Sequence, residues 1–339
     1  MQADRKFMSL AFSLAKRGWG GTSPNPMVGA LVVKNGKVIG RGFHRRAGEA
    51  HAEINALNDA GTDARNATLY VTLEPCCTFG RTPPCTDAII SSGIRRAVIG
   101  CLDPNPKHAG KGLKILQKAG IEVTANVLEK ECRELNDAFF HWITTGRPFV
   151  LLKMAMTLDG KIATAKGDSK WVTGPKARTR VQKLRQWADA VMVGGETART
   201  DKPSLTVREF RSSKQPRRII VSKILTSEKL KKLLPPGPDP EVISPKNRQE
   251  WISELKRLGK ENVTSILVEG GGELASEMLN SGIIDKVEFH IAPKILGGRN
   301  SRPVVGGKDP LSLSEALPLQ NISLKKIDGD MCISGYMKS

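Results

Sequence analysis

Four residues at fixed spacing constrain this chain more than any other feature: His51, Glu53, Cys76 and Cys85. One imidazole and two thiolates suit a tetrahedral zinc ion whose fourth position is left for water. A zinc-bound water becomes a nucleophile near neutral pH. Glu53 stands two residues after the histidine, where it can take the proton of that water and pass it to a leaving amine. These residue types together predict a catalytic zinc site with its own proton carrier.

Two other interpretations of the same residues stay open. A structural zinc site would use four protein ligands and would have no role for a carboxylate beside the histidine. Alternatively Cys77, which adjoins Cys76, is the ligand in its place. The remaining cysteines are scattered singly in apolar or helical contexts, where we expect buried free thiols: Cys101, Cys132 and Cys332.

Length and composition limit the class of protein. A chain of 339 residues exceeds one typical hydrophobic core, so two domains are expected. The 39% hydrophobic and 26% charged residues are ordinary for a globular protein. The six cysteines show no disulfide rhythm, so we expect a reducing, cytoplasmic location. No apolar run approaches the roughly 20 residues that span a bilayer, so no membrane partner is expected.

The formal charge of +19 raises the question of an anionic partner. Basic proteins gain affinity for nucleic acid by displacing counterions from phosphates. Here, however, the basic residues are spread over the whole chain, and the 5% aromatic residues leave few platforms for stacked bases. We therefore expect no nucleic-acid partner. A phosphorylated small molecule would also benefit from the positive field, and a basic surface without a specific role stays an equal alternative.

Hydrophobic periodicity predicts alternating helices and strands over the first 145 residues. A helix should begin near Phe7 and end near Gly18, and Asn35-Gly36 should join strands 28–33 and 37–43 in a hairpin. The pattern continues with helix 52–60, strand 67–73, helix 86–92, strand 95–101, helix 110–120 and helix 128–142. This alternation favours a layered α/β domain.

Three motifs in this half identify a family. The run TLEPCCTFGRTPPC at 72–85, HAE at 51–53 and PNPMVG at 24–29 together resemble the deaminase half of the bifunctional riboflavin-biosynthesis deaminase/reductases. The resemblance covers about the first 145 residues and implies a cytidine-deaminase-like three-layer domain. It also implies zinc bound by His51, Cys76 and Cys85, with Glu53 as the catalytic proton carrier. The family usually has serine and histidine where this chain has Cys77 and Thr78.

The same resemblance implies a set of substrate-binding residues in the deaminase half: Asn25, His44, Arg81, Asp103 and Asn105. Asn25 lies between two prolines, and the Asp-Pro-Asn-Pro loop follows the carboxyl end of a predicted strand, where open α/β sheets place ligands. Arg81 and His108 are both candidates for a phosphate contact. Without the resemblance, Asn25 would be an ordinary turn residue and the loop a solvated turn.

Turn residues at 144–148 mark a boundary, after which the alternation resumes. Strands are predicted at 149–156, 190–194, 218–221, 241–244, 264–269 and 287–292, with helices at 176–187, 248–258 and 273–279. Gly270, Gly271 and Gly272 separate a strand from a helix, which would let a phosphate approach the backbone. They do not form the Gly-x-Gly-x-x-Gly fingerprint, so an ordinary Rossmann domain is disfavoured.

Four further motifs resemble the reductase half of the same family: LLKMAMTLDGKIA at 151–163, SKWVTG at 169–174, VGGETARTDKPSLTVR at 193–208 and LVEGGGELA at 267–275. The resemblance implies a dihydrofolate-reductase-like fold that uses NADPH. The expected organisation is therefore a zinc-dependent pyrimidine deaminase domain at 1–145 and an NADPH-dependent reductase domain at 149–339.

Carried over by position, the resemblance implies an NADPH-binding set: Ala155, Trp171, Thr197, Asp201, Ser222, Gly271, Gly272, Glu273, Leu274, Ala275, Ser276 and Glu277. It implies a reductase substrate set: Ser169, Arg185, Leu205, Arg208 and Glu269. The two arginines suit a sugar phosphate because a guanidinium fork binds phosphate at two points. Taken singly, each would be a solvated charge, and Trp171 would equally well be a core ring.

The expected activity has two steps. Zinc-dependent hydrolysis would remove the 2-amino group of 2,5-diamino-6-(5-phosphoribosylamino)pyrimidin-4(3H)-one, and NADPH would then reduce the ribosyl group to ribityl. The expected partner is this phosphorylated pyrimidine, and we expect a homo-oligomer. Two rival hypotheses are a nucleic-acid-editing deaminase, which leaves the second half without a role, and a non-catalytic zinc scaffold.

Overall fold

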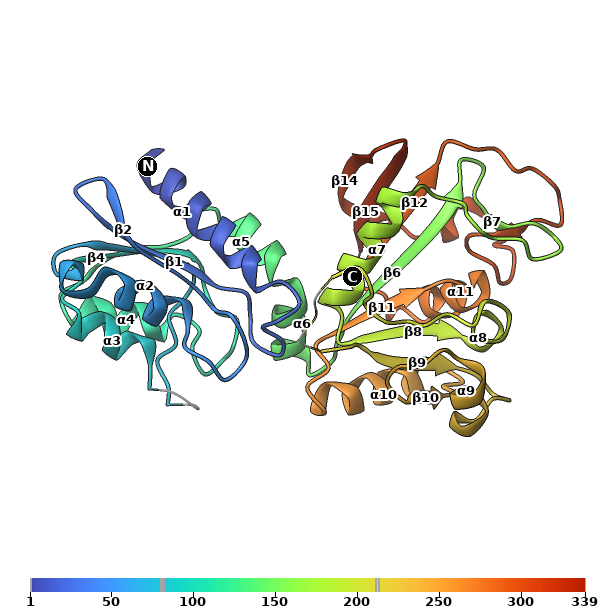
Figure 1. Cartoon of the computed structure of the whole chain (residues 1–339), viewed down its shortest axis with the longest axis horizontal. Coiled ribbons are helices and arrows are strands. Elements are labelled where there is room, and N and C mark those ends of the chain that lie inside the picture. The colour runs from blue at the N-terminus through green and yellow to red at the C-terminus, as the bar shows by residue number, and fades with distance from the viewer. Residues whose placement is uncertain (1, 80–82, 211, 213, 339) are drawn as a thin grey trace. The chain divides into compact units, whose positions relative to one another are not determined.

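The computed structural model describes residues 2–79, 83–210, 212 and 214–338 (Figure 1). The chain divides into two compact units, residues 1–146 and residues 147–339. Each unit has a hydrophobic core of its own around a β-sheet. None of the described helices is both long and apolar enough to cross a membrane.

The sheet of the first unit has the strand order β2-β1-β3-β4-β5. Its strands are β1 (Gly29–Lys34), β2 (Lys37–Phe43), β3 (Thr68–Leu73), β4 (Arg96–Cys101) and β5 (Glu122–Thr124). The predicted hairpin between β1 and β2 is confirmed, and Asn35 and Gly36 both have positive φ, as its turn requires. Strands β3, β4 and β5 are parallel, so their carboxyl ends meet at one edge of the sheet.

Helices cover both faces of this sheet, as the predicted three-layer fold requires. They are α1 (Gln2–Ala15), α2 (Ala52–Ala60), α3 (Cys85–Ser91), α4 (Lys111–Lys118), α5 (Glu129–Leu135) and α6 (Asp137–Thr145), with 3-10 turns Lys16–Gly18 and Gly61–Ala64. Gly29 packs against α1, whereas Gly42 packs against α2. Gly42 pairs with Ala30, the residue after Gly29. Because successive residues of a strand face opposite sides, α1 and α2 cover opposite faces.

The single helix predicted at 128–142 is wrong, because the chain forms α5 and α6 with Asn136 between them. Asn136 has a non-helical conformation, with φ −118° and ψ 21°. Its buried side chain accepts a hydrogen bond from the Met27 amide at 2.7 Å and donates one to the Met27 carbonyl at 2.9 Å. Asn136 therefore anchors the loop that carries Asn25. Its contact with Met27 joins residues 109 positions apart, which local periodicity cannot predict.

The larger sheet of the second unit has the strand order β10-β9-β8-β11-β6-β12-β15-β14 in the described part of the chain. Its parallel strands were predicted from sequence: β6 (Phe149–Thr157), β8 (Ala190–Gly194), β9 (Arg217–Val221), β10 (Pro240–Ile243), β11 (Ser265–Glu269) and β12 (Lys286–Ala292). The antiparallel strands β14 (Leu319–Ile327) and β15 (Asp330–Met337) were not predicted.

Five helices and smaller elements complete this unit among its described residues. They are α7 (Pro175–Trp187), α8 (Gly195–Asp201), α9 (Ser227–Leu233), α10 (Arg248–Lys260), α11 (Gly272–Asn280), a 3-10 turn Leu313–Glu315, and the paired strands β7 (Lys161–Ala163) and β13 (Arg302–Pro303). Trp251 of α10 is fully buried in the core. The layered α/β architecture predicted for both halves is confirmed.

The contact between β2 and α2 generates a stability prediction. A Cβ atom at Gly42 would overlap the carbonyl oxygen of Ala52, a backbone atom that cannot move without shifting α2. We expect Gly42→Ala to destabilise the first unit by about 2 kcal/mol, the usual cost of overpacking. Thermal unfolding would measure this loss. Gly329→Ala is the control, because a Cβ there meets no atom within 4 Å, and an equal loss in both variants would contradict the prediction.

Candidate active sites

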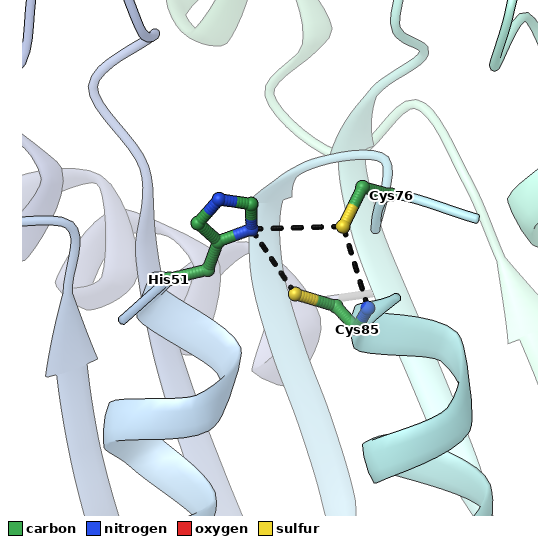
Figure 2. Close-up of side chains that lie close together, drawn as sticks. All are labelled: His51, Cys76 and Cys85. Carbon is green, nitrogen blue, oxygen red and sulfur yellow. Dashed lines mark hydrogen bonds between the residues drawn. The ribbon is translucent and has the colours of Figure 1, made fainter. Parts of the chain in front are cut away.

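The predicted metal ligands come together at the edge of the first sheet (Figure 2). His51 precedes the first residue of α2, Cys76 lies in the loop after β3, and Cys85 begins α3. The Nδ1 atom of His51 lies 3.2 Å from the Sγ atom of Cys85 and 3.6 Å from that of Cys76. The backbone N–H of Cys85 donates to the Cys76 sulfur at 3.3 Å. Three elements that are distant in sequence thus direct their donor atoms to one point.

This arrangement fits a zinc ion. Tetrahedral coordination with ordinary Zn–S and Zn–N bonds separates nitrogen and sulfur ligands by about 3.5 Å, close to the two observed distances. Hydrogen bonding from Cys85 lowers the pKa of the Cys76 thiol to about 4, while the same hydrogen bond and burial raise the pKa of Cys85. One of the two sulfurs is therefore readily available as a thiolate ligand. No fourth protein ligand joins the trio among the described residues, so the position that a structural site would fill stays available for water.

Cys77 does not join the group. Its sulfur lies 3.5 Å from Nδ1 of His108, on a different loop, and its amide N–H points to the same nitrogen. The metal-binding group contains His51, Cys76 and Cys85 without Cys77. The geometry therefore favours Cys76 over its neighbour as the ligand.

Glu53 lies in the first turn of α2, two residues from the histidine, and its side chain is almost entirely buried. Burial disfavours the charged carboxylate and raises its pKa to about 7. A carboxyl group in this environment exchanges a proton readily near neutral pH.

His44 and Asn25 lie together beside the metal ligands. The Nδ1 atom of His44 lies 3.2 Å from the Ala50 carbonyl, and its Nε2 atom lies 3.1 Å from the amide nitrogen of Asn25. A carbonyl can only accept and an amide NH₂ can only donate, so His44 carries its proton on Nδ1. Burial lowers the pKa of His44, which agrees with this neutral form. Its ring meets the His51 ring edge to face at 5.3 Å.

Asp103 and Asn105 lie on the loop after β4, and this loop is anchored by Glu74, which sequence reasoning missed. The buried carboxylate of Glu74 accepts three backbone hydrogen bonds, from Asp103 at 3.1 Å, Gly110 at 2.9 Å and Gly112 at 2.9 Å. Glu74 stands two residues before Cys76, so one side chain ties the metal-ligand segment to the loop. The sequence signal that could have identified Glu74 was its place in the run Leu-Glu-Pro-Cys, which ends at the ligand Cys76. The remaining predicted residue, Arg81, lies outside the described residues.

A cavity of about 1220 Å³ opens in the second unit at the carboxyl ends of its parallel strands. It exceeds the volume of most single-ligand sites, so it has room for a dinucleotide and a second molecule. Most of the predicted reductase residues line it: Ala155, Ser169, Trp171, Arg185, Thr197, Asp201, Leu205, Arg208, Glu269, Gly271, Gly272, Glu273, Leu274 and Glu277.

Three predicted cofactor residues do not line this cavity: Ser222, Ala275 and Ser276. The Ser222 hydroxyl accepts the backbone N–H groups of Ile224 and Leu225 at 3.3 and 3.1 Å, so it shapes the turn after β9. The other two are buried within α11. Trp171 is 65% exposed and lies under the Arg178 guanidinium at 4.6 Å, so the alternative of a core ring is wrong.

The turn before α11 has the conformation expected of a phosphate-binding backbone. Gly270 and Gly271 have φ values of 72° and 91°, which strongly favour glycine. The first N–H groups of α11 are left without helical partners, and the helix dipole favours negative charge at this end. Thr197 of α8 lies beside Gly271, so two helix starts border the same part of the cavity.

Arg185 was expected to bind a sugar phosphate, but in the structure its guanidinium binds a carboxylate. Its Nε and Nη2 atoms donate to the two carboxylate oxygens of Glu269 at 2.6 and 2.8 Å, and Nη1 donates to the Thr206 carbonyl at 3.2 Å. Burial by itself would raise the pKa of Glu269, but the Arg185 charge holds it below its usual value. The guanidinium fork thus holds a carboxylate. Arg208 is exposed at the rim, and no hydrogen bond to its guanidinium is found within the described ranges.

Lys153 is a cavity residue that sequence reasoning missed. It lies on β6, is almost fully buried, and borders the cavity beside Ala155. Burial lowers the pKa of Lys153. The sequence could have indicated this residue, because a single lysine within the apolar run LLKMAM is unusual in a strand inside a sheet.

The metal trio generates a prediction that separates the two adjacent cysteines. Cys76→Ser should lower zinc content to less than a tenth, because it removes one of three protein donors. Cys77→Ser should retain one zinc ion per chain. Metal analysis after exhaustive dialysis would measure both, and retention of zinc by Cys76→Ser with loss in Cys77→Ser would reverse the assignment.

Comparison with known proteins identifies a family for each unit. The family described as RibD C-terminal domain matches residues 148–333, and the family described as cytidine and deoxycytidylate deaminase zinc-binding region matches residues 1–101. A riboflavin biosynthesis protein RibD from Aquifex aeolicus is 44% identical over 351 residues, covering 98% of each chain.

Two solved structures cover both units together. RibD of Acinetobacter baumannii superposes with a TM-score of 0.88 and 36% identity, covering 100% of this chain and 99% of that one. A diaminohydroxyphosphoribosylaminopyrimidine deaminase/5-amino-6-(5-phosphoribosylamino)uracil reductase of Thermotoga maritima superposes with a TM-score of 0.86 and 38% identity, covering 99% of each. The chain therefore belongs to the RibD family of riboflavin biosynthesis proteins, and it is a bifunctional enzyme that combines a zinc-dependent deaminase with an NADPH-dependent reductase.

Proposed function

We propose that residues 1–145 deaminate 2,5-diamino-6-(5-phosphoribosylamino)pyrimidin-4(3H)-one and that residues 149–339 reduce the ribosyl group of the product to ribityl. The relative from Thermotoga maritima is described by these two activities. The observation that carries the proposal is the group of His51, Cys76 and Cys85 with the buried carboxyl of Glu53 beside it. The product of both steps is 5-amino-6-(5-phosphoribitylamino)uracil.

In the deaminase unit, His51, Cys76 and Cys85 would hold zinc, which supplies a water of lowered pKa when bound. Glu53 takes a proton from the attacking water and delivers it to the exocyclic nitrogen at C2. The C–N bond breaks, ammonia leaves, and C2 keeps the oxygen. Burial of Glu53 favours this role, because the protonated carboxylic acid is not penalised by its surroundings.

The deaminase substrate is positioned by side chains around this centre. His44 takes one N–H of the Asn25 amide, which orients the rest of that amide towards the pyrimidine. Asp103 and Asn105 contact the ring and its ribosyl phosphate, on a loop that Glu74 holds in place. The family resemblance assigns the phosphate contact to Arg81, with His108 as the alternative, and a guanidinium would bind the phosphate by charge-assisted hydrogen bonds.

In the reductase unit, the cavity residues would bind NADPH, which supplies a hydride to C1′ of the ribosyl group. Opening of the sugar leaves its ring oxygen in need of a proton. We assign this proton to the Lys153 ammonium, which lies among the lining residues. Arg208 is placed to bind the phosphate, while Arg185 keeps Glu269 charged and oriented for substrate hydroxyl groups. Ser169 and Leu205 complete the substrate set.

Three wider features follow as part of the same proposal. The six cysteines are all free, which suits a reducing cytoplasm. Edge strand β14 exposes Ile322 and Leu324, and such an edge favours pairing with a second copy of the chain, hence a homo-oligomer. The substrate is a phosphorylated small molecule, which accounts for part of the positive charge, and a nucleic-acid editing enzyme would leave the reductase cavity without a role.

The proton carrier gives a direct test. Glu53→Gln should reduce ammonia release by about a thousandfold, because the isosteric amide cannot transfer the proton. Zinc content should stay at one per chain, and NADPH oxidation on supplied deaminated intermediate should be unchanged. Glu49→Gln, at an exposed position nearby, is the control. Ammonia release at the normal rate in Glu53→Gln would refute the assignment and support a scaffold role.

A second test addresses the reductase cavity. Arg185→Ala leaves the buried Glu269 without the cation that keeps it charged and oriented, so we expect NADPH oxidation to fall by about a hundredfold. Deamination by the same protein should continue. Lys176→Ala removes an exposed charge from the same helix and should leave both activities intact. Normal NADPH oxidation by Arg185→Ala would contradict the role given to this ion pair.

A further inference from the structure

Glu288, His290 and Cys332 form a second buried group of potential metal ligands, outside the sites assigned above. Glu288 and His290 lie two residues apart on β12, and Cys332 is paired with His290 on the adjacent strand β15. Their donor atoms all lie within 4.8 Å of one another, and all three side chains are buried. The Nδ1 atom of His290 has no hydrogen-bond partner among the described residues.

The hydrogen bonds of Glu288 argue against a metal at this place. Arg180 of α7 donates from Nε and Nη2 to the two carboxylate oxygens at 3.1 and 3.0 Å. The Nε2 atom of His290 lies 2.8 Å from Oε1 of the same carboxylate. A divalent cation would have to displace the guanidinium and add charge beside Lys153. Arg180 is therefore already the counterion of Glu288, and the three residues do not form a vacant metal site.

The sheet register shows what this carboxylate faces. Lys153 on β6 is paired with Glu269 on β11 at one side and with Glu288 on β12 at the other. Each glutamate is held at two points by an arginine of the same helix, Glu269 by Arg185 and Glu288 by Arg180. Lys153 therefore lies between the two glutamates in the register of three neighbouring strands, on the same face of the sheet, and it borders the cavity.

We propose that Glu288, held by Arg180 and His290, is a positioning residue that keeps Lys153 in its ammonium form, ready to give a proton to the opening sugar. This inference rests on the proposed reductase function. Glu288 does not line the cavity, so it acts only through Lys153.

The charges around Lys153 come from every element packed against it. Burial disfavours its ammonium form, Glu269 and Glu288 favour it, and Arg185 opposes it. Burial also lowers the pKa of His290, so this ring is neutral and donates from Nε2 to Glu288 without adding charge. Cys332 retains its proton, because burial raises its pKa to about 11. The balance at Lys153 therefore depends on Glu288 and on how much of its charge Arg180 cancels.

Two variants of the full-length protein should move the pH profile of reduction in opposite directions. Glu288→Gln removes the negative charge, so the loss of activity at high pH should shift to lower pH by about one unit. Arg180→Met exposes Lys153 to the full charge of Glu288, so this limb should shift to higher pH. The double variant should return towards the original profile. The measurement is kcat/KM for NADPH oxidation on supplied deaminated intermediate.

The controls separate charge from damage to the fold. Deamination by the same protein should be unchanged, and Asp328→Asn removes an exposed carboxylate paired with Lys176 of α7 and should not move the limb. If Glu288→Gln does not fold, Arg180→Met still decides the sign, because its side chain is partly exposed.

Several results would overturn the inference: no alkaline limb, no shift, shifts in the same direction, or a second zinc ion per chain that is lost in Glu288→Gln. If the unmodified protein does not oxidise NADPH with the deaminated intermediate, the proposed function itself fails. Normal oxidation with an unmoved limb overturns only the role of Glu288.

Discussion

Burial of charge is the constraint on which both units depend, because a carboxylate taken out of water needs donors or a cation around it. Glu74 has three backbone N–H groups, whereas Glu269 and Glu288 each have an arginine bound at two points. Glu53 is buried beside the metal ligands, and burial raises its pKa to about 7, so this carboxyl group can exchange a proton near neutral pH. The partner of each carboxylate therefore decides whether it anchors a loop, orients a substrate or moves a proton.

Both units place this chemistry at the carboxyl ends of parallel strands. Cys76 follows β3 and Asp103 follows β4, while Glu269 ends β11. The loops that follow these strand ends are not bound by the hydrogen bonds of the sheet. Their side chains can therefore converge on a ligand, while the strands form the core below them. The helices that begin at these edges, α3 and α11, then contribute a ligand in one unit and free N–H groups in the other.

Much of this was available from sequence. The donors His51, Cys76 and Cys85 were named from their residue types and from a resemblance to the zinc deaminases. The Asn35-Gly36 turn predicted the hairpin between β1 and β2. Other features could not be named. Asn136 interrupts the helix where its side chain holds Met27 by two hydrogen bonds, and Lys153 lies between two glutamates because of the register of three strands. Arg185 was predicted to meet phosphate, but its fork holds Glu269 instead, an ion pair spanning 84 residues.

The sequence by itself determined most of the parallel strands and of the helices beside them, because hydrophobic periodicity is a local pattern. It also determined the donor types of the metal centre and the family, because these are read from residue types and motifs. Tertiary structure alone decided which of two adjacent cysteines faces His51, which arginine neutralises which glutamate, and that the buried Lys153 borders the cavity. These choices depend on strand register and on how each helix packs. Strand register and helix packing bring together residues that are far apart in sequence. Because an unpaired buried charge is costly, each buried glutamate then pairs with the arginine beside it.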